Sequence, residues 1–366
     1  MCESAYIHIP FCKTICSYCD FCKIFYNKEF VERYLDSLEL EIKSNYQGEV
    51  IKSIYIGGGT PSCLGIDELQ RLFEIIKIFN KDDGVEFTIE CNIETLTEEK
   101  INLFLANGIN RVSIGVQSLI DKNIKFLERH HNRELVIEKI NLLKTKGINN
   151  INLDLIYALP NQTMEDLKYD LDEYMKLGIT HISTYSLMIE PNTKLFINNT
   201  DNISEELDSK MYNFICSYLK QKGFKHYEIS NFCLDGYESI HNLTYWNNNK
   251  YYGFGVGASG YIDDIRYDNT RSITNYINNI NNKEEIVLDK NMDIENEFIL
   301  GLRKIKGISK KEFKEKYNKQ LCDIIIVKNL LKLGKLMDNG EYIFIPEEYL
   351  YVSNSILLNF IGGSYE

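Results

Sequence analysis

The stretch YIHIPFCKTICSYCDF, residues 6–21, joins an apolar, strand-like run to a loop that carries three cysteines. Cys12, Cys16 and Cys19 have the spacing Cys-x3-Cys-x2-Cys, so one short loop supplies three thiolates directly after the first strand. Thiolates bind both iron–sulfur clusters and structural zinc, and the ligand type alone leaves both open. Cys22 could complete a four-thiolate zinc site. Zinc ribbons, however, usually draw two cysteine pairs from separate knuckles, whereas these cysteines lie in one loop.

A glycine-rich loop follows the next strand. The apolar run 54–56 leads into Gly57-Gly58-Gly59-Thr60-Pro61, and then into a helix whose apolar residues recur on one face between Ile66 and Phe79. Three glycines at the end of a strand let backbone amides approach a ligand closely. The loop therefore favours a bound cofactor beside the cysteines over a purely structural zinc site.

The first 200 residues repeat a unit of strand, loop and amphipathic helix. Gly108, Gly147 and Gly178 each precede an apolar run, and each is expected to end the preceding helix in a left-handed conformation. The predicted strands are 5–9, 54–56, 85–89, 111–115, 151–155 and 181–185. A capping box, Thr95-x-x-Glu98, is expected to open the helix after the third strand. Six βα units predict an α/β fold, an incomplete TIM-type (β/α)6 barrel with too few units to close.

Polar side chains stand at the ends of four of these strands. They are Glu90, Gln117, Asp154 and Tyr185. A carboxylate such as Asp154 is costly in a core without a partner, and a salt bridge or a loop cap explains any single one equally well. Four of them on one rim indicate a functional site, because such sites gather where parallel strands end.

The pattern changes beyond residue 200. A helix near 204–222 is followed by aromatic-rich and asparagine-rich sequence from His226 to about Asn282. The remainder is expected to form helices and a hairpin with Asn339-Gly340 as its two-residue turn, which resembles a winged helix. We therefore predict a partial barrel over 1–200, a connecting region over 201–290 and a winged-helix-like α+β extension over 291–366.

The charge balance restricts the partners. The formal net charge is −12 and the pI is near 5.2, which argues against broad attachment to nucleic acid or to an anionic membrane. The start of the chain lacks the basic stretch and apolar run of a secretion signal, and no apolar run approaches the ~18 residues of a membrane span. The cytoplasm is therefore the expected location, where thiols stay reduced and clustered cysteines indicate metal binding.

Tyr6-x-His8-Ile9-Pro10-Phe11-Cys12, the three-cysteine spacing and the Gly-Gly-Gly-Thr-Pro loop resemble the radical S-adenosylmethionine (SAM) superfamily. More narrowly, they resemble the branch that contains oxygen-independent coproporphyrinogen III oxidase and the heme chaperone HemW. The resemblance implies a [4Fe–4S] cluster on Cys12, Cys16 and Cys19, with one open iron that the amino and carboxylate groups of SAM chelate. In this superfamily an electron from the reduced cluster cleaves the sulfonium and gives a 5′-deoxyadenosyl radical.

The resemblance also implies a set of SAM contacts. By position, the residues that match contacts in the oxidase branch are Tyr6, Gly58, Gly59, Thr60, Glu90, Gln117, Arg129, Asp154 and Met188. Tyr18 matches an aromatic residue that packs on an adenine. Some of these serve a second SAM in the oxidase, and a second site here stays open. Glu128 replaces the glycine of the family's G-R-x-H run, although Arg129 is retained.

Two local features favour the HemW branch. Phe21 stands where the oxidase has a fourth cysteine, and Cys22 stands where HemW sequences usually have asparagine. His241-Asn242-Leu243-Thr244-Tyr245-Trp246 resembles the H-N-x-x-Y-W motif that is associated with heme binding in HemW proteins. His241 and Tyr245 would share one helical face as candidate iron ligands, and Trp246 could stack on a porphyrin. From chemistry alone, a packed histidine among aromatic residues is the commoner explanation.

The leading hypothesis is a heme chaperone that delivers heme to apo-haemoproteins and carries a cluster and SAM. It implies an electron donor and a cluster-promoted homodimer as partners, and a membrane-associated recipient stays compatible with the absence of a membrane span. The alternative is an oxygen-independent coproporphyrinogen III oxidase, which would decarboxylate two propionates by radical chemistry. A third hypothesis is a binding protein whose cysteine loop holds a structural zinc ion and which carries out no radical chemistry.

Overall fold

The computed structural model describes residues 1–280, 283–363 and 365. Its centre is one nine-stranded sheet with the order β11-β1-β4-β5-β6-β7-β8-β10-β9. The bounds of these strands are β1 (Ser4–Ile9), β4 (Ile51–Gly58), β5 (Lys81–Asn92), β6 (Arg111–Gln117), β7 (Asn150–Tyr157), β8 (His181–Ser186), β9 (Lys225–Glu228), β10 (Asn231–Cys233) and β11 (Tyr252–Phe254). All six predicted strands are present, and neighbours from β1 through β8 pair in parallel.

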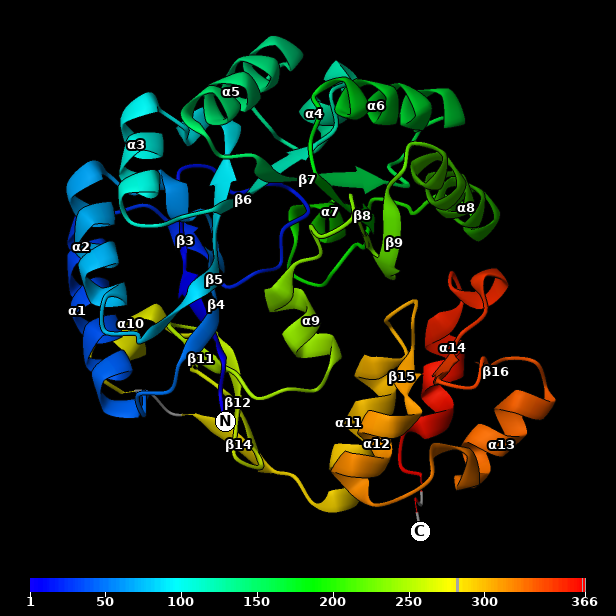
Figure 1. Cartoon of the computed structure of the whole chain (residues 1–366). Helices are drawn as coiled ribbons and strands as arrows, with labels where there is room; N and C mark the ends of the chain where they lie inside the picture. Colours follow the sequence, from blue (N-terminus) through cyan, green and yellow to red (C-terminus); the bar gives the residue numbers. More distant parts are fainter. Residues whose placement is uncertain (281–282, 364, 366) are drawn as a thin grey trace.

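Helices cover the outer, convex side of this curved sheet (Figure 1). They are α1 (Lys28–Asn45), α2 (Ile66–Ile76), α3 (Glu98–Ala106), α4 (Asp121–Phe126), α5 (Arg133–Lys146), α6 (Met164–Lys176) and α8 (Glu205–Gln221). The sheet is open, because its edge strands β11 and β9 do not pair with each other in the described part of the chain. The prediction of an incomplete barrel with six βα units is therefore confirmed.

The glycine signals mark the helix ends as predicted. Gly108, Gly147 and Gly178 have φ values of +85°, +102° and +59°, which is the left-handed region that glycine adopts without strain. The strands that follow are buried on both faces, as their continuous apolar runs require. Each glycine thus turns the chain from an outer helix back into the sheet.

The capping-box prediction at Thr95 is wrong. Residues Ile93–Thr95 form a short 3-10 turn, in which the Thr95 hydroxyl donates to the Asn92 carbonyl at 2.8 Å. The helix therefore begins two residues later, and Thr97 is its N-cap and accepts from the Lys100 amide. Thr95 cannot cap because its side chain already closes the preceding turn.

Both edges of the sheet come from beyond residue 200. β11 pairs in parallel with β1, and β10 pairs antiparallel with β8 and β9. Between these edges lies helix α9 (Ile240–Trp246), which contacts β4 on the concave side of the sheet (Figure 1). A small antiparallel sheet of β12 (Ser259–Ile262), β13 (Ile265–Asp268) and β14 (Glu284–Val287) extends from β11. The cysteine loop lies between two short strands, β2 (Phe11–Cys12) and β3 (Ile24–Phe25).

The last part of the chain forms the predicted winged-helix-like extension. It contains α11 (Lys290–Gly301), α12 (Lys310–Tyr317), α13 (Ile325–Lys332) and α14 (Ser353–Leu357) around a sheet of β15 (Ile308–Ser309), β17 (Tyr342–Phe344) and β16 (Met337–Asp338). Shorter elements are α7 (Lys194–Ile197) and α10 (Ile273–Ile277). The hairpin turn is centred one residue later than predicted, because Asn339 already pairs with Tyr342 and leaves Gly340 and Glu341 as the turn. The division at residues 200 and 290 stays a prediction.

Candidate functional site

A pocket of about 390 Å³ opens where the parallel strands end. It brings together the residues that the sequence singled out: Cys12, Cys16, Tyr18, Cys19, Gly58, Gly59, Thr60, Glu90, Gln117, Arg129, Asp154, Tyr185 and Met188. We call this the cysteine pocket. The four polar strand ends thus share one rim, as predicted, and their roles in binding stay a prediction. Tyr6 is the exception, because it lines a neighbouring pocket instead.

The three cysteines form one wall of the cysteine pocket. Cys12 is buried and its Sγ lies 3.5 Å from the Thr60 hydroxyl, whereas Cys16 and Cys19 are half-buried. Burial raises the pKa of the Cys12 thiol to about 11. No three His, Cys, Asp or Glu side chains of the described residues are close enough to hold one metal ion. The fit of a cluster therefore rests on three free thiols in one loop that face one pocket.

The glycine-rich loop lies directly against the cysteine loop. The Gly59 amide donates to the Ile9 carbonyl at 2.9 Å, and the Thr60 amide donates to the Phe11 carbonyl at 2.9 Å. A Cβ atom on Gly59 would lie 2.9 Å from Cys12 Sγ and from the Phe11 carbonyl, closer than real Cβ contacts occur. Glycine is therefore required here for the packing of two loops, in addition to any approach of a ligand.

Two carboxyl groups face each other across the strand ends. Glu90 accepts hydrogen bonds from the Tyr55 hydroxyl at 2.7 Å and from the Gly58 amide at 3.0 Å, and burial raises its pKa to about 7. Asp154 accepts from Asn152 Nδ2 at 2.8 Å, and burial raises its pKa to about 6. The site therefore offers anionic acceptors whose charge responds to pH near neutrality.

Arg129 closes the other side of the cysteine pocket. Its guanidinium donates to Asn92 Oδ1 from both terminal nitrogens at 3.1 Å, and its Nη1 lies 3.6 Å from Cys16 Sγ. Gln117 adopts a positive φ of 66°, and its buried Oε1 has no hydrogen-bond partner among the described residues. Unpaired buried polar atoms on a pocket wall are typical of a site that a ligand completes.

The sequence analysis missed Arg111. This arginine lies at the start of β6, lines the cysteine pocket and is 2% exposed. Its Nε and Nη1 have no hydrogen-bond partner in the described chain. The available signal was a charged residue at the start of a buried, mostly apolar strand, where an arginine is costly without a partner.

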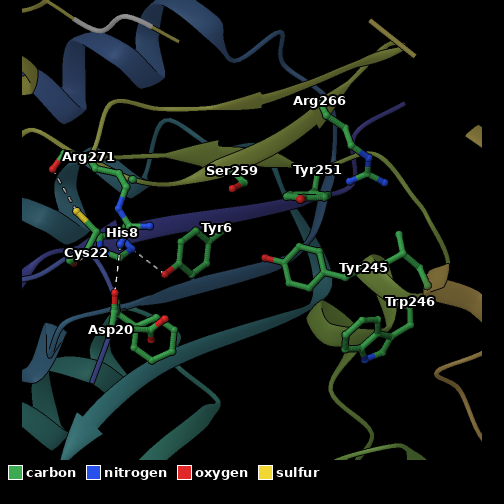
Figure 2. A pocket seen from close by; sticks show the side chains of 13 residues that line it. Tyr6, His8, Asp20, Cys22, Tyr245, Trp246, Tyr251, Ser259, Arg266 and Arg271 are labelled. Carbon is green, nitrogen blue, oxygen red and sulfur yellow. Dashed lines mark hydrogen bonds between the residues drawn. The ribbon is translucent and has the colours of Figure 1, made fainter. Parts of the chain in front are cut away.

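A second pocket of about 420 Å³, shown in Figure 2, shares lining residues with the first. Asp20 and Phe21, at the end of the cysteine loop, line both pockets. Besides Phe21 and the ring of His8, the second pocket is lined by the aromatic side chains of Tyr6, Tyr245, Trp246 and Tyr251, and we call it the aromatic pocket. His8 links it to the cysteine loop, since its Nε2 lies 2.7 Å from the Cys22 carbonyl and its Nδ1 lies 3.0 Å from the Tyr6 hydroxyl.

Helix α9 carries the H-N-x-x-Y-W motif. His241 is 1% exposed, with Nδ1 2.9 Å from Ser53 Oγ and Nε2 2.8 Å from the Tyr245 hydroxyl. Its ring stacks on Tyr55 with a centroid distance of 5.1 Å, and burial lowers its pKa to about 3. His241 and Tyr245 share one helical face as predicted. In this conformation, however, both nitrogens of His241 are engaged, and only Tyr245 and Trp246 reach the aromatic pocket.

The comparisons with known proteins agree on one family. Residues 6–173 match the model of the radical SAM superfamily. The heme chaperone HemW of Lactococcus lactis is 40% identical, over 98% of this chain and 97% of its own length. The heme chaperone HemW of Bacillus subtilis is 37% identical, over 98% of this chain and 99% of its own.

The fold matches that of a solved structure. The coproporphyrinogen III oxidase HemN of Escherichia coli superimposes with a TM-score of 0.86, over 98% of this chain and 90% of that one. The two sequences are 21% identical, so this likeness concerns the fold. Among the described residues, no helix is both long and apolar enough to cross a membrane.

Proposed function

The chain belongs to the radical SAM superfamily and, within it, to the HemW family, and on that basis we propose that it is a heme chaperone that binds heme and delivers it to haemoproteins. One structural observation supports this most directly. The motif helix α9 presents Tyr245 and Trp246 to a pocket that shares Asp20 and Phe21 with the cysteine pocket. A heme in the aromatic pocket would therefore lie next to the loop that holds the cluster.

Cys12, Cys16 and Cys19 would hold a [4Fe–4S] cluster. Three free thiols in one loop, packed against a glycine loop that admits no side chain, match the donor set of a cluster with one open iron. The cluster, when bound, would supply the electron for reductive cleavage of SAM. The remaining parts of the cysteine pocket would bind and orient that SAM.

The polar groups of the cysteine pocket suit SAM, which carries a positive sulfonium and amino group and a carboxylate. Glu90 and Asp154 offer acceptors to the cationic groups, and Arg129 offers donors. The remaining predicted contacts, Tyr18, Gln117 and Met188, lie around the same space. Tyr6, on the other side of the loop, would act through the Tyr6–His8–Cys22 hydrogen-bond chain rather than by direct contact.

Tyr245 is the motif residue best placed to bind the heme iron. Its hydroxyl end points into the aromatic pocket (Figure 2), and phenolate oxygen is an established ligand of ferric heme. His241 Nε2, 2.8 Å away, would orient the Tyr245 hydroxyl by a hydrogen bond, and with its pKa lowered to about 3 the imidazole would not retain the proton that Tyr245 releases when it binds iron. His241 would then be a positioning residue, and Trp246 would pack on the macrocycle.

The partners follow from this function. We propose delivery in the cytoplasm, where the ten free cysteines stay reduced, to apo-haemoprotein recipients. An electron donor would reduce the cluster, and a homodimer would form when the cluster is loaded. The acidic chain leaves no role for nucleic acid.

A heme-transfer assay tests the proposed function. Cluster-reconstituted protein is loaded with hemin under anaerobic conditions and mixed with apomyoglobin, whose Soret band reports the heme that it receives. We expect saturable loading, followed by transfer at a rate that changes when SAM is added or the cluster is removed. Absence of saturable loading would overturn the proposal, and a transfer rate equal to that from a hemin–albumin mixture, insensitive to SAM, would restrict it to heme binding.

A further inference from the structure

The aromatic pocket has one wall of a different chemistry. Aromatic rings from β1 and α9 form one side, whereas the strand pair β12–β13 and the segment after it contribute Ser259, Arg266 and Arg271 (Figure 2). Two arginines and one acidic residue, Asp20, therefore line a space whose other large side chains are mostly aromatic. Such a combination suits a flat aromatic ligand that carries carboxylates.

Arg266 is held by neutral and aromatic groups. Its Nη2 donates to Asn248 Oδ1 at 2.6 Å, and its guanidinium carbon lies 4.4 Å from the centre of the Tyr261 ring. Its Nε is buried and has no hydrogen-bond partner in the described residues. The guanidinium group of Arg266 is therefore held in place, while its Nε–H donor makes no hydrogen bond in the described residues.

Arg271 stands exposed at the rim, next to the cysteine loop. Its Nη2 donates to the Asp20 carbonyl at 3.1 Å, and its own carbonyl accepts from Cys22 Sγ at 3.5 Å. Both contacts use backbone oxygens or a thiol rather than a carboxylate. Arg271 thus combines a position against the cysteine loop with a guanidinium group that forms no ion pair in the described part of the chain.

Most of the eight arginines of this chain form no ion pair within the described residues. The chain has 53 acidic and 41 basic residues, and Arg71 and Arg133 both form ion pairs with nearby carboxylates. Arg266 and Arg271 form none within residues 1–280, 283–363 and 365. What distinguishes Arg266 and Arg271 is their position: two arginines without an ion pair line one pocket beside aromatic rings, where a carboxylate-bearing ligand would find guanidinium donors.

We propose that Arg266 and Arg271 bind the two propionate carboxylates of heme, one each, while the rings of Tyr245, Trp246 and Tyr251 pack on the macrocycle. This inference rests on the proposed function, since it names the groups that recognise the heme. The guanidinium fork matches a carboxylate in two parallel hydrogen bonds, so these residues select a macrocycle that carries free carboxylates.

Esterification of the propionates provides the test. Hemin and hemin dimethyl ester are titrated anaerobically into the cluster-reconstituted wild type, Arg266→Gln, Arg271→Gln and the double variant. Arg71→Gln is the matched control, because Arg71 lies in a surface ion-pair group. We expect the wild type to prefer hemin about tenfold or more, since a hydrogen bond to a charged group contributes roughly a factor of ten. Each pocket variant should lose hemin affinity by a similar factor and keep its affinity for the ester.

The outcomes distinguish a wrong assignment of the two arginines from a wrong proposed function. Wild-type affinity for hemin in the double variant, or an equal loss toward both ligands, overturns the assignment of the arginines. Equal binding of hemin and its ester by the wild type overturns it as well, while leaving the proposed function intact. No saturable binding of either ligand by the wild type would overturn the proposed function itself. Arg266→Lys keeps the positive charge but lacks the planar guanidinium group. Its preference for hemin over the ester should therefore lie between those of the wild type and Arg266→Gln.

Discussion

His241 Nε2 lies 2.8 Å from the phenolic oxygen of Tyr245, one helical turn further along α9. The other ring nitrogen lies 2.9 Å from Ser53 Oγ, so the histidine is fixed between the sheet and the tyrosine. This arrangement makes the histidine of the motif a hydrogen-bond partner that orients the tyrosine hydroxyl, and it leaves the tyrosine to line the aromatic pocket. One hydrogen bond thus gives the two residues different roles: His241 positions the side chain and Tyr245 contacts the ligand.

We expect Tyr245→Phe to remove the phenolate signature of the bound ferric heme. The variant keeps the ring but lacks the oxygen, so its heme should show a shifted Soret band and lose the phenolate-to-iron charge-transfer band in resonance Raman spectra. Tyr251→Phe is the control, because Tyr251 lines the same pocket but does not contact His241. A phenolate signature that persists in Tyr245→Phe would contradict the assignment.

SAM affinity should rise with pH between about 5.5 and 7.5. Burial raises the pKa of Glu90 to about 7 and that of Asp154 to about 6, so both carboxyls gain charge as pH increases through this window. Ionised carboxylates attract the cationic sulfonium, and proton release on binding makes the affinity increase with pH, by up to about tenfold per unit below the pKa. Calorimetric titration should show a flatter profile for Glu90→Gln. An identical slope in that variant would exclude Glu90 as the responsible group.

Gly59→Ala should impair cluster loading. The new methyl group would lie 2.9 Å from Cys12 Sγ, and relief of that contact requires the two loops to separate. Iron and sulfide per chain after anaerobic reconstitution should fall well below the wild-type values. Gly84→Ala, at an exposed position with its nearest neighbour atom at 3.4 Å, is the control and should load normally. Full loading of Gly59→Ala would mean that the loops tolerate the side chain.

We expect no decarboxylation of coproporphyrinogen III. Phe21, at the position of the oxidase's fourth cysteine, is 65% exposed at the junction of the two pockets and supplies no ligand. Chromatography of anaerobic, reducing reactions should find no vinyl product, while SAM cleavage is followed in the same samples. Formation of the vinyl product would favour the oxidase activity over the chaperone.

Much of the fold could be predicted because the signals were local. Each glycine after a helix, such as Gly147, sets a left-handed turn regardless of distant residues, and each continuous apolar run fits a buried parallel strand. The edges of the sheet could not be predicted. β11 pairs with β1 through Ala5 and Tyr252, which are far apart in the sequence, and no local pattern in a three-residue strand reports such a partner.

For the candidate site, too, local sequence patterns could be interpreted and tertiary packing could not. The spacing of Cys12, Cys16 and Cys19 and the polar strand ends were visible in the sequence because each lies in a short, regular context. The four-residue spacing also placed His241 and Tyr245 on one face of a helix. It could not say that this face turns His241 against Ser53 and Tyr55 on a strand of the sheet, since that depends on tertiary packing.

The most direct test of the account is an anaerobic hemin titration of the cluster-reconstituted protein, followed by Soret absorbance. Wild type is compared with His241→Ala and with His130→Ala, which removes an exposed histidine outside the motif. We expect a saturable, one-to-one response in the wild type and in His130→Ala, and its loss in His241→Ala, because Tyr245 loses the hydrogen bond that fixes its hydroxyl group. Equal, weak and non-saturating responses in all three proteins would contradict a specific heme site at this motif.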